Sequence, residues 1–287
     1  MQEIKLGNSS AYINEIGAEL KSFKAQGRQM VWQTIPAIWN SSAPVLFPFV
    51  GLVRNNKYSF HGKEYAMSKH GFVRNKKFAV TGKTESSVKL SIFANDETLK
   101  IYPFKFEFSV KFSIVSENKL LVEYEVKNSD DKKMFFSLGS HPALDLPLKD
   151  TCHEDYYIEF EQPETVYLYK LVDGLLERLK TPFMTNEKVV KLSSHIFDDD
   201  ALIFTGIKSR FAYLKNDKTR RCVRVCFGGA PDLGIWAKPG ADYVCIEPWF
   251  GYNDPADFKG YLDQKPGIIG LDQGKNFTAF YAIESLS

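Results

Sequence analysis

The stretch FKFEFSVKFSIV, residues 104–115, alternates apolar and polar side chains along its whole length. Because successive side chains of a strand point to opposite faces, this period of two predicts a strand with one buried face. SENK, residues 116–119, then provides a turn, and LLVEYEVKN, residues 120–128, alternates again. The two segments predict an antiparallel hairpin that packs one face on a core. The side chains expected in that core from the first strand are Phe104, Phe106, Phe108, Val110, Phe112 and Ile114.

The same alternation continues on both sides of this hairpin. SSVKLSIFA (86–94) and DYYIEFE (155–161) repeat it, whereas helical periodicity is scarce. The best candidate for a short helix is DPADFKGYLDQ, residues 254–264, and its glycine limits the length. The 287 residues contain no internal repeat and no Pro/Ser-rich linker. We therefore predict an all-β protein with one domain over residues 1–287, a large antiparallel β-sandwich.

Composition excludes several classes of protein. Hydrophobic residues make up 44% and charged residues 25% of the chain, the balance of a soluble globular protein. The net charge of +2, from 37 basic and 35 acidic residues, argues against a general nucleic-acid binder. No stretch approaches the roughly 18 consecutive apolar residues that span a bilayer, and no signal sequence is recognisable. These features predict a cytoplasmic protein with no nucleic-acid partner and no membrane partner.

The cysteines support the same location. None of the four forms a CxxC pair, and Cys222 and Cys226 lie four apart on a predicted strand. They would share a face of that strand but lie too far apart along it for an easy disulfide. We expect reduced cysteines that serve mainly in packing, as is usual in the cytosol.

Two histidines interrupt the strand pattern. In SKHGFVRNKKF (68–78), His70 precedes a glycine, which would let backbone or ligand approach closely. On these residues alone, a histidine in a turn is the commoner explanation. In SLGSHPALDLP (137–147), Pro142 favours an extended His141 and removes one ladder hydrogen bond. His141 could equally be a half-buried side chain bonded to a backbone carbonyl.

An acidic residue ends an apolar strand in DYVCIEPWFGYND, residues 242–254. Glutamate is seldom fully buried without a partner, so Glu247 could be a base with a tuned pKa, or an exposed strand-end residue. Trp249 beside it could offer an apolar platform for a sugar ring, whereas Trp236 is expected in the core. Arg54 and Arg74 could bind an anion or several hydroxyls, although single loop arginines are usually solvated.

Three short motifs, HGFVR (70–74), SHPAL (140–144) and CIEPWFG (245–251), occur in this order. Together they resemble the aldose 1-epimerase (galactose mutarotase-like) family, most of all its compact branch of LacX-type and hexose-6-phosphate-epimerase-like proteins. The likeness extends from INEIGAELKSF (13–23) to GIIGLDQGKNFTAFY (267–281).

The resemblance implies a galactose mutarotase-like supersandwich that binds a sugar in an open cleft on one sheet, with no metal and no organic cofactor needed. By position, His141 matches the general acid and Glu247 the general base. The resemblance also implies that His70 binds the substrate near the ring oxygen and that Arg54, in a shortened loop, binds it too. In the sugar-phosphate branch, Arg74 would contact a 6-phosphate. The substrate-binding aspartate falls in FDDDALIF (197–204), where we choose Asp200 over Asp199.

The expected function is that of an isomerase, an aldose 1-epimerase or mutarotase acting on an aldohexose such as galactose. A base removes the proton of the C1 hydroxyl while an acid protonates O5, the ring opens, and closure gives the other anomer. The alternatives are a hexose-6-phosphate 1-epimerase and a non-catalytic carbohydrate-binding protein on the same fold. A glycosidase would need a second carboxylate about 5 to 9.5 Å from Glu247. The expected partner is a small sugar or sugar phosphate, and the protein would be a monomer or a homodimer.

Overall fold

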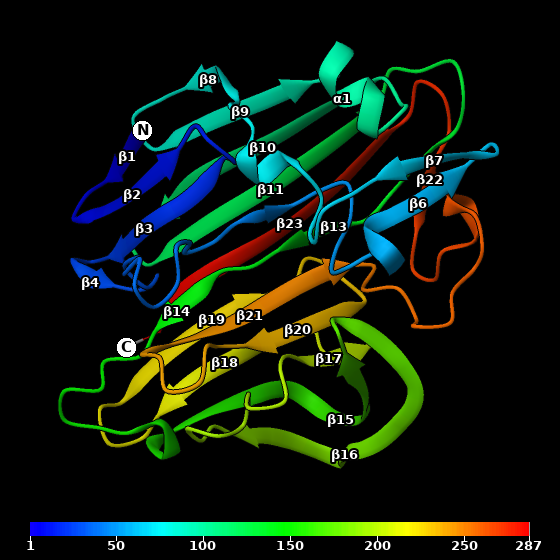
Figure 1. Ribbon diagram of the computed structural model, residues 1–287. Helices are drawn as coiled ribbons and strands as arrows, with labels where there is room; N and C mark the ends of the chain where they lie inside the picture. The colour runs from blue at the N-terminus through cyan, green and yellow to red at the C-terminus, as the bar shows by residue number, and fades with distance from the viewer. Residues whose placement is uncertain (287) are drawn as a thin grey trace.

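The computed structural model describes residues 1–286, and antiparallel strands dominate it (Figure 1). The larger sheet has nine strands and runs from β8 at the top of Figure 1 to β16 at the bottom. In sheet order its strands are β16 (Leu175–Lys191), β15 (Tyr156–Val172), β18 (Phe211–Asn216), β19 (Arg221–Cys226), β23 (Asn276–Ser285), β11 (Lys119–Asn128), β10 (Phe106–Ser116), β9 (Ser87–Phe93) and β8 (Ala79–Lys83).

A second sheet of six strands carries two of the segments that interrupted the sequence pattern, those of His141 and Glu247. Its order is β17 (Leu202–Thr205), β20 (Asp232–Trp236), β21 (Tyr243–Phe250), β13 (Leu138–Ser140) and β5 (Val45–Leu46), and β14 (Ala143–Asp145) also pairs with β21. The smaller sheets are β1 (Gln2–Leu6), β2 (Ser9–Asn14), β3 (Glu19–Ala25) and β4 (Arg28–Gln29); β6 (Lys57–Phe60) with β7 (Lys63–Ala66); and β12 (Met134–Phe136) with β22 (Ile269–Leu271). The predicted all-β, antiparallel class is confirmed.

The hairpin predicted from residues 104–128 is β10 paired with β11. Phe108 lies opposite Val126 and Phe112 opposite Val122, in the antiparallel register that the alternation requires. All six apolar side chains expected in the core are buried. Phe47, from the loop after β5, stacks on Phe108 with ring centroids 4.6 Å apart. The buried face of the hairpin therefore meets the six-stranded side of the molecule.

One contiguous apolar cluster draws side chains from both large sheets and from the N-terminal strands. It includes Phe23 of β3, Val122 of β11 and Ile246 of β21. This shared core is compatible with a single domain over residues 1–287, which stays a prediction. Within residues 1–286, no helix is long and apolar enough to cross a membrane, and all four cysteines carry free thiols.

The helix expected at residues 254–264 was wrong. This segment is irregular and ends in a short 3-10 turn, Leu262–Gln264, and the backbone at its start bonds to the tip of the β15–β16 hairpin. The Leu176 N–H donates to the Asp254 carbonyl, and the Ala256 N–H donates to the Leu176 carbonyl. The one α-helix in the described part of the chain, α1 (Asp96–Ile101), begins at Asn95, whose side chain caps two backbone N–H groups.

Candidate active site

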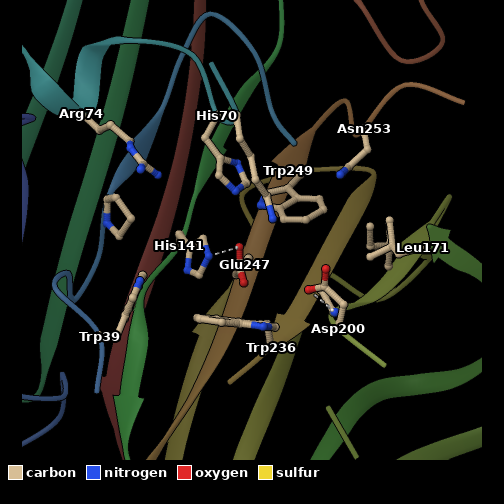
Figure 2. A pocket seen from close by; sticks show the side chains of 14 residues that line it. Trp39, His70, Arg74, His141, Leu171, Asp200, Trp236, Glu247, Trp249 and Asn253 are labelled. Atoms are coloured by element: carbon tan, nitrogen blue, oxygen red, sulfur yellow. Dashed lines mark hydrogen bonds and ion pairs between the residues drawn. The ribbon is translucent and has the colours of Figure 1, made fainter. Parts of the chain in front are cut away.

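A cavity of about 180 Å³ lies at the junction of β21, β13 and β14. Figure 2 shows His141 and Glu247 facing each other in it, with Trp39 and Trp236 on one side and His70 and Trp249 on the other. The structure thus brings together most of the residues that the sequence singled out. The complete lining is Trp39, Pro44, Lys69, His70, Arg74, His141, Leu171, Asp200, Ala201, Ile203, Trp236, Glu247, Trp249 and Asn253.

Strand register places His141 opposite Glu247. Gly139 pairs with Trp249 before the break in the strand, and Ala143 pairs with Cys245 after it, so β13 and β14 keep one register along β21. The break falls at Pro142, which has no N–H to donate to the ladder. His141 Nε2 lies 3.3 Å from Glu247 Oε2. The expected acid and base therefore form a contact pair where the ladder is interrupted.

Burial governs the charge of this pair, since His141 is 8% and Glu247 1% exposed. Desolvation raises the pKa of the Glu247 carboxyl well above its ordinary value, although the positive charge of Lys69 opposes the shift. Desolvation also lowers the pKa of His141 to about 3. A neutral imidazole beside a neutral carboxyl contains as many protons as an imidazolium beside a carboxylate. The two forms differ only by transfer of a proton across the 3.3 Å contact.

His70 contributes a hydrogen-bond donor of fixed tautomer. The Gly51 N–H donates to His70 Nδ1 at 3.1 Å, so the proton of the neutral ring is on Nε2. Burial and the nearby His141 lower the pKa of His70 well below its ordinary value, which keeps the ring neutral. The two imidazole rings lie 5.8 Å apart and nearly perpendicular. His70 can therefore offer an N–H to an oxygen atom that His141 also approaches.

Gly71 lets the loop of His70 pass close to the core. His70 and Gly71 both have left-handed backbones, with φ of 68° and 76°. A Cβ added at Gly71 would lie 2.1 Å from the Phe47 carbonyl oxygen. The close approach expected from the glycine in HGFVR is present, and it involves backbone.

Aromatic rings surround the pair. The ring centroid of Trp39 lies 5.1 Å and that of Trp236 5.6 Å from that of His141. Trp249 lines the cavity as expected. Trp236 packs against the core as expected, but its half-buried ring also lines the cavity. Trp39 was not singled out from the sequence. The only signal available for it was an aromatic residue in an irregular segment, AIWNSSAP (37–44).

Several buried polar atoms around the cavity lack hydrogen bonds. His141 Nδ1 and Asn253 Oδ1 have none to any atom of the described chain, and Glu247 Oε2 has only its 3.3 Å contact with His141 Nε2. Buried polar groups are nearly always satisfied, so an unsatisfied group calls for a ligand, a water or a functional explanation. A polyhydroxy compound offers the donors and acceptors that these atoms require.

Two cationic side chains line this cavity. Arg74, in the 3-10 turn Val73–Asn75, was expected here, whereas its neighbour Lys69 was not. Lys69 and Arg74 are both exposed, and neither side chain forms a hydrogen bond or an ion pair with another residue in 1–286. They could neutralise an anionic group on a bound ligand.

Asp200 lies in the cavity lining and Asp199 does not. The Asp200 backbone is left-handed, with φ of 81°, and its Oδ1 accepts the Ala201 N–H at 2.8 Å. Its second carboxylate oxygen can accept a hydrogen bond from a ligand hydroxyl. This position is compatible with the choice of Asp200 over Asp199, whose substrate-binding role stays a prediction.

Arg54 lies elsewhere. Its side chain lines a second cavity, and its Nη1 donates to the Phe258 carbonyl at 3.3 Å. The turn Arg54–Asn56 contains left-handed residues at Asn55 and Asn56, and the Arg54 N–H is held by Asp254. These local bonds keep Arg54 on the second cavity, so its position does not support the expected contact with the sugar.

One group of side chains could offer three metal ligands. Atoms of His141, Cys245 and Glu247 lie within 4.8 Å of one another, and all three residues are buried. Burial raises the pKa values of both the Cys245 thiol and the Glu247 carboxyl, so a metal would have to displace two protons.

Comparison with known proteins places these features in a family. The family model described as aldose 1-epimerase matches residues 2–262. The plasmid and chromosomal forms of Protein LacX from Lactococcus lactis subsp. lactis are each 31% identical over 95% of this chain and 96% of LacX. A galactose mutarotase related enzyme from Lactobacillus acidophilus superposes with a TM-score of 0.94 at 36% identity, covering 100% of this chain and 97% of its own. A galactose mutarotase-like protein from Lactobacillus casei ATCC 334 gives 0.91 at 29% identity, covering 99% of both chains.

Proposed function

This chain belongs to the aldose 1-epimerase family, and on that premise we propose that it is an isomerase that interconverts the α and β anomers of an aldohexose. The observation that carries the proposal is the buried pair of His141 and Glu247, with 3.3 Å between Nε2 and Oε2. Anomer exchange needs one acid and one base that return to their starting forms, and a pair sharing one proton meets that need.

The proposed reaction follows the position of that proton. With the proton on His141, the Glu247 carboxylate removes the proton of the C1 hydroxyl while the imidazolium protonates O5. The C1–O5 bond breaks, which leaves an open-chain aldehyde between a neutral carboxyl and a neutral imidazole. Burial favours this neutral form of the pair. Rotation about C1–C2 presents the other carbonyl face, and the reverse transfers close the opposite anomer.

Other residues of the cavity would hold the sugar. The Nε2–H of His70 would donate near the ring oxygen, which is supported by the Gly51 N–H that already occupies Nδ1. Trp39, Trp236 and Trp249 offer apolar ring surface for the C–H groups of the sugar. Asp200 and Asn253 supply hydrogen-bond acceptors for its hydroxyls.

The direct test is anomer exchange measured by NMR on glucose and galactose, with and without the protein. We expect exchange between the α and β signals to accelerate in proportion to protein concentration. A protein that binds either sugar without accelerating exchange would instead be the non-catalytic carbohydrate-binding protein that the same fold allows.

A phosphorylated hexose is the second candidate substrate. Lys69 and Arg74 favour it, because both line the cavity and neither is neutralised by a carboxylate of the described chain. A guanidinium pairs well with phosphate in both charge and geometry. Running the same exchange measurement on glucose 6-phosphate and galactose 6-phosphate distinguishes this substrate class from the free sugars.

A further inference from the structure

The second cavity has a volume of about 400 Å³ and shares no lining residue with the candidate active-site cavity. Two segments far apart in sequence form it, residues 53–64 and residues 254–265. Its lining is Val53, Arg54, Asn55, Lys57, Tyr58, Ser59, Glu64, Asp254, Phe258, Lys259, Gly260, Leu262 and Lys265. It is therefore a separate place on the molecule where a ligand could bind.

Both carboxylates of this cavity already have cationic partners. Lys265 Nζ lies 2.7 Å from Asp254 Oδ1, and the two side chains are 2% and 5% exposed. The other oxygen of Asp254 accepts the Arg54 N–H at 2.9 Å. Glu64 pairs with Lys57 at 3.3 Å on the exposed side. Neither carboxylate is left to neutralise a further cation.

Two cations remain without a carboxylate partner among residues 1–286, namely Arg54 and Lys259. Arg54 uses one guanidinium N–H on the Phe258 carbonyl, so most of its five donors are free. Lys265 donates to the Tyr252 carbonyl and to Asp254, which leaves the third proton of a deeply buried ammonium unused. The cavity thus combines an excess of two positive charges with free N–H donors.

We propose that the second cavity binds a phosphate dianion, as inorganic phosphate or as the phosphate group of a sugar phosphate, through Arg54, Lys259 and Lys265. A dianion matches the two uncompensated positive charges, whereas a carboxylate would match only one. The guanidinium fork of Arg54 can bond two phosphate oxygens, and Lys265 supplies a fixed donor from the wall. The proposal does not depend on the reaction proposed for the first cavity.

The test isolates this site from the first cavity. In a Lys69→Met/Arg74→Met background, titration calorimetry with inorganic phosphate measures only binding that does not need those two cations. We expect one phosphate bound per chain, and affinity at least about tenfold weaker when Arg54→Met and Lys259→Met are added. Absence of phosphate binding by the background protein at millimolar concentrations would overturn the proposal, as would unchanged affinity after the added substitutions.

A single exposed substitution keeps the test decisive if the combined variant fails to fold. Lys259→Glu replaces one proposed phosphate contact by a repelling charge, and its matched control is Lys63→Glu on β7, which does not line the cavity. In the Lys69→Met/Arg74→Met background, we expect Lys259→Glu to abolish measurable phosphate binding and Lys63→Glu to leave it unchanged. Equal affinities in the two variants would contradict the proposal.

A parallel titration with glucose 6-phosphate in the Lys69→Met/Arg74→Met background, counting only the binding that Lys259→Glu removes, separates the two sources of phosphate at this cavity. Tighter binding than that of inorganic phosphate supports a sugar phosphate as the ligand, and equal or weaker binding supports inorganic phosphate itself. Free glucose serves as the uncharged control and should give no binding that depends on Lys259.

Discussion

His141 and Glu247 lie opposite each other at the gap between the β13–β21 and β14–β21 pairings. His141 Nε2 lies 3.3 Å from Glu247 Oε2. Pro142 follows the histidine and Pro248 follows the glutamate, and neither can donate a backbone hydrogen bond to its neighbouring strand. The ladder resumes at Ala143, which pairs with Cys245. The two side chains are therefore held by regular sheet on either side of the gap.

Removing either member of the pair should remove catalysis without unfolding the protein. Glu247→Gln and His141→Asn keep the approximate shape of each side chain but prevent its proton transfer. We expect catalysed mutarotation to fall by about 100- to 10,000-fold in each variant. Polarimetry on freshly dissolved α-glucose or α-galactose measures the rate, and circular dichroism checks the fold. Rates like those of the unsubstituted protein in both variants would exclude these roles.

Arg74→Ala should distinguish free from phosphorylated substrates. If Arg74 contacts a 6-phosphate, loss of its guanidinium should raise KM for hexose 6-phosphates by about tenfold or more and leave free hexoses little changed. Lys69→Met should act in the same direction, since Lys69 lines the same cavity. Steady-state kinetics on glucose and glucose 6-phosphate decide the matter. Equal losses on both substrates would argue against a phosphate contact.

Gly71→Ala should destabilise the protein more than Gly62→Ala. Both glycines have left-handed backbones, with φ of 76° and 75°, so both variants carry a similar backbone cost of about 1 kcal/mol. A Cβ at Gly71 would also meet the Phe47 carbonyl at 2.1 Å, whereas nothing lies within 4 Å at Gly62. We expect an additional loss of about 1–3 kcal/mol at Gly71. Urea denaturation of the two variants gives both values, and equal losses would refute the role of the close contact.

Breaking the buried ion pair of the second cavity should cost far more than breaking its exposed pair. Lys265→Met leaves Asp254 buried without its ammonium partner, and we expect a loss of about 3–5 kcal/mol. Lys57→Met removes the partner of Glu64, where the two side chains are 56% and 66% exposed, and should cost no more than about 1 kcal/mol. Chemical denaturation at neutral pH compares the two. A small effect of Lys265→Met would mean that Asp254 is adequately stabilised by the Arg54 N–H alone.

The buried His70 should make folding stability depend on pH. Its pKa is lowered well below 6.5 in the folded protein, so the unfolded chain takes up a proton below pH 6.5 that the folded chain does not. Its contribution to stability is therefore present above pH 6.5 and falls as the pH is lowered, by about 1.4 kcal/mol per unit. His70→Asn lacks this titration. The stability difference between the two proteins, measured from pH 7 to pH 5, should change with that sign, and a constant difference would contradict it.

The elements themselves follow from local sequence. The alternation over residues 104–128 predicted β10, β11 and their buried face, because a period of two can place its apolar side chains on only one side of a sheet. The segment 254–264 shows the limit of such patterns. Its backbone groups bond to Leu176 in the tip of a distant hairpin, and nothing in the local sequence reports that competition.

The site could be predicted only in part. His70, His141 and Glu247 were singled out because a glycine or proline beside each one breaks the strand pattern. Lys69, Trp39 and Asn253 carry no such signal, since a lysine, tryptophan or asparagine in a loop is ordinary. Family resemblance assigned Arg54 to the sugar, but hydrogen bonds to Asp254 and Phe258 hold it at the second cavity.

By itself, then, the sequence determined the all-β class, the hairpin and the strand break at Pro142, because periodicity and proline act through neighbouring residues. The strand expected to stop at Pro248 instead continues to Phe250, where it pairs with β20 and β13. Only the tertiary structure decided that the break at His141 faces Glu247, that Lys69 stands beside the pair, and that Arg54 lines a different cavity. Those facts depend on the register between distant strands and on the paths of long loops. Register is fixed by contacts formed on folding, and no short stretch of the chain contains them.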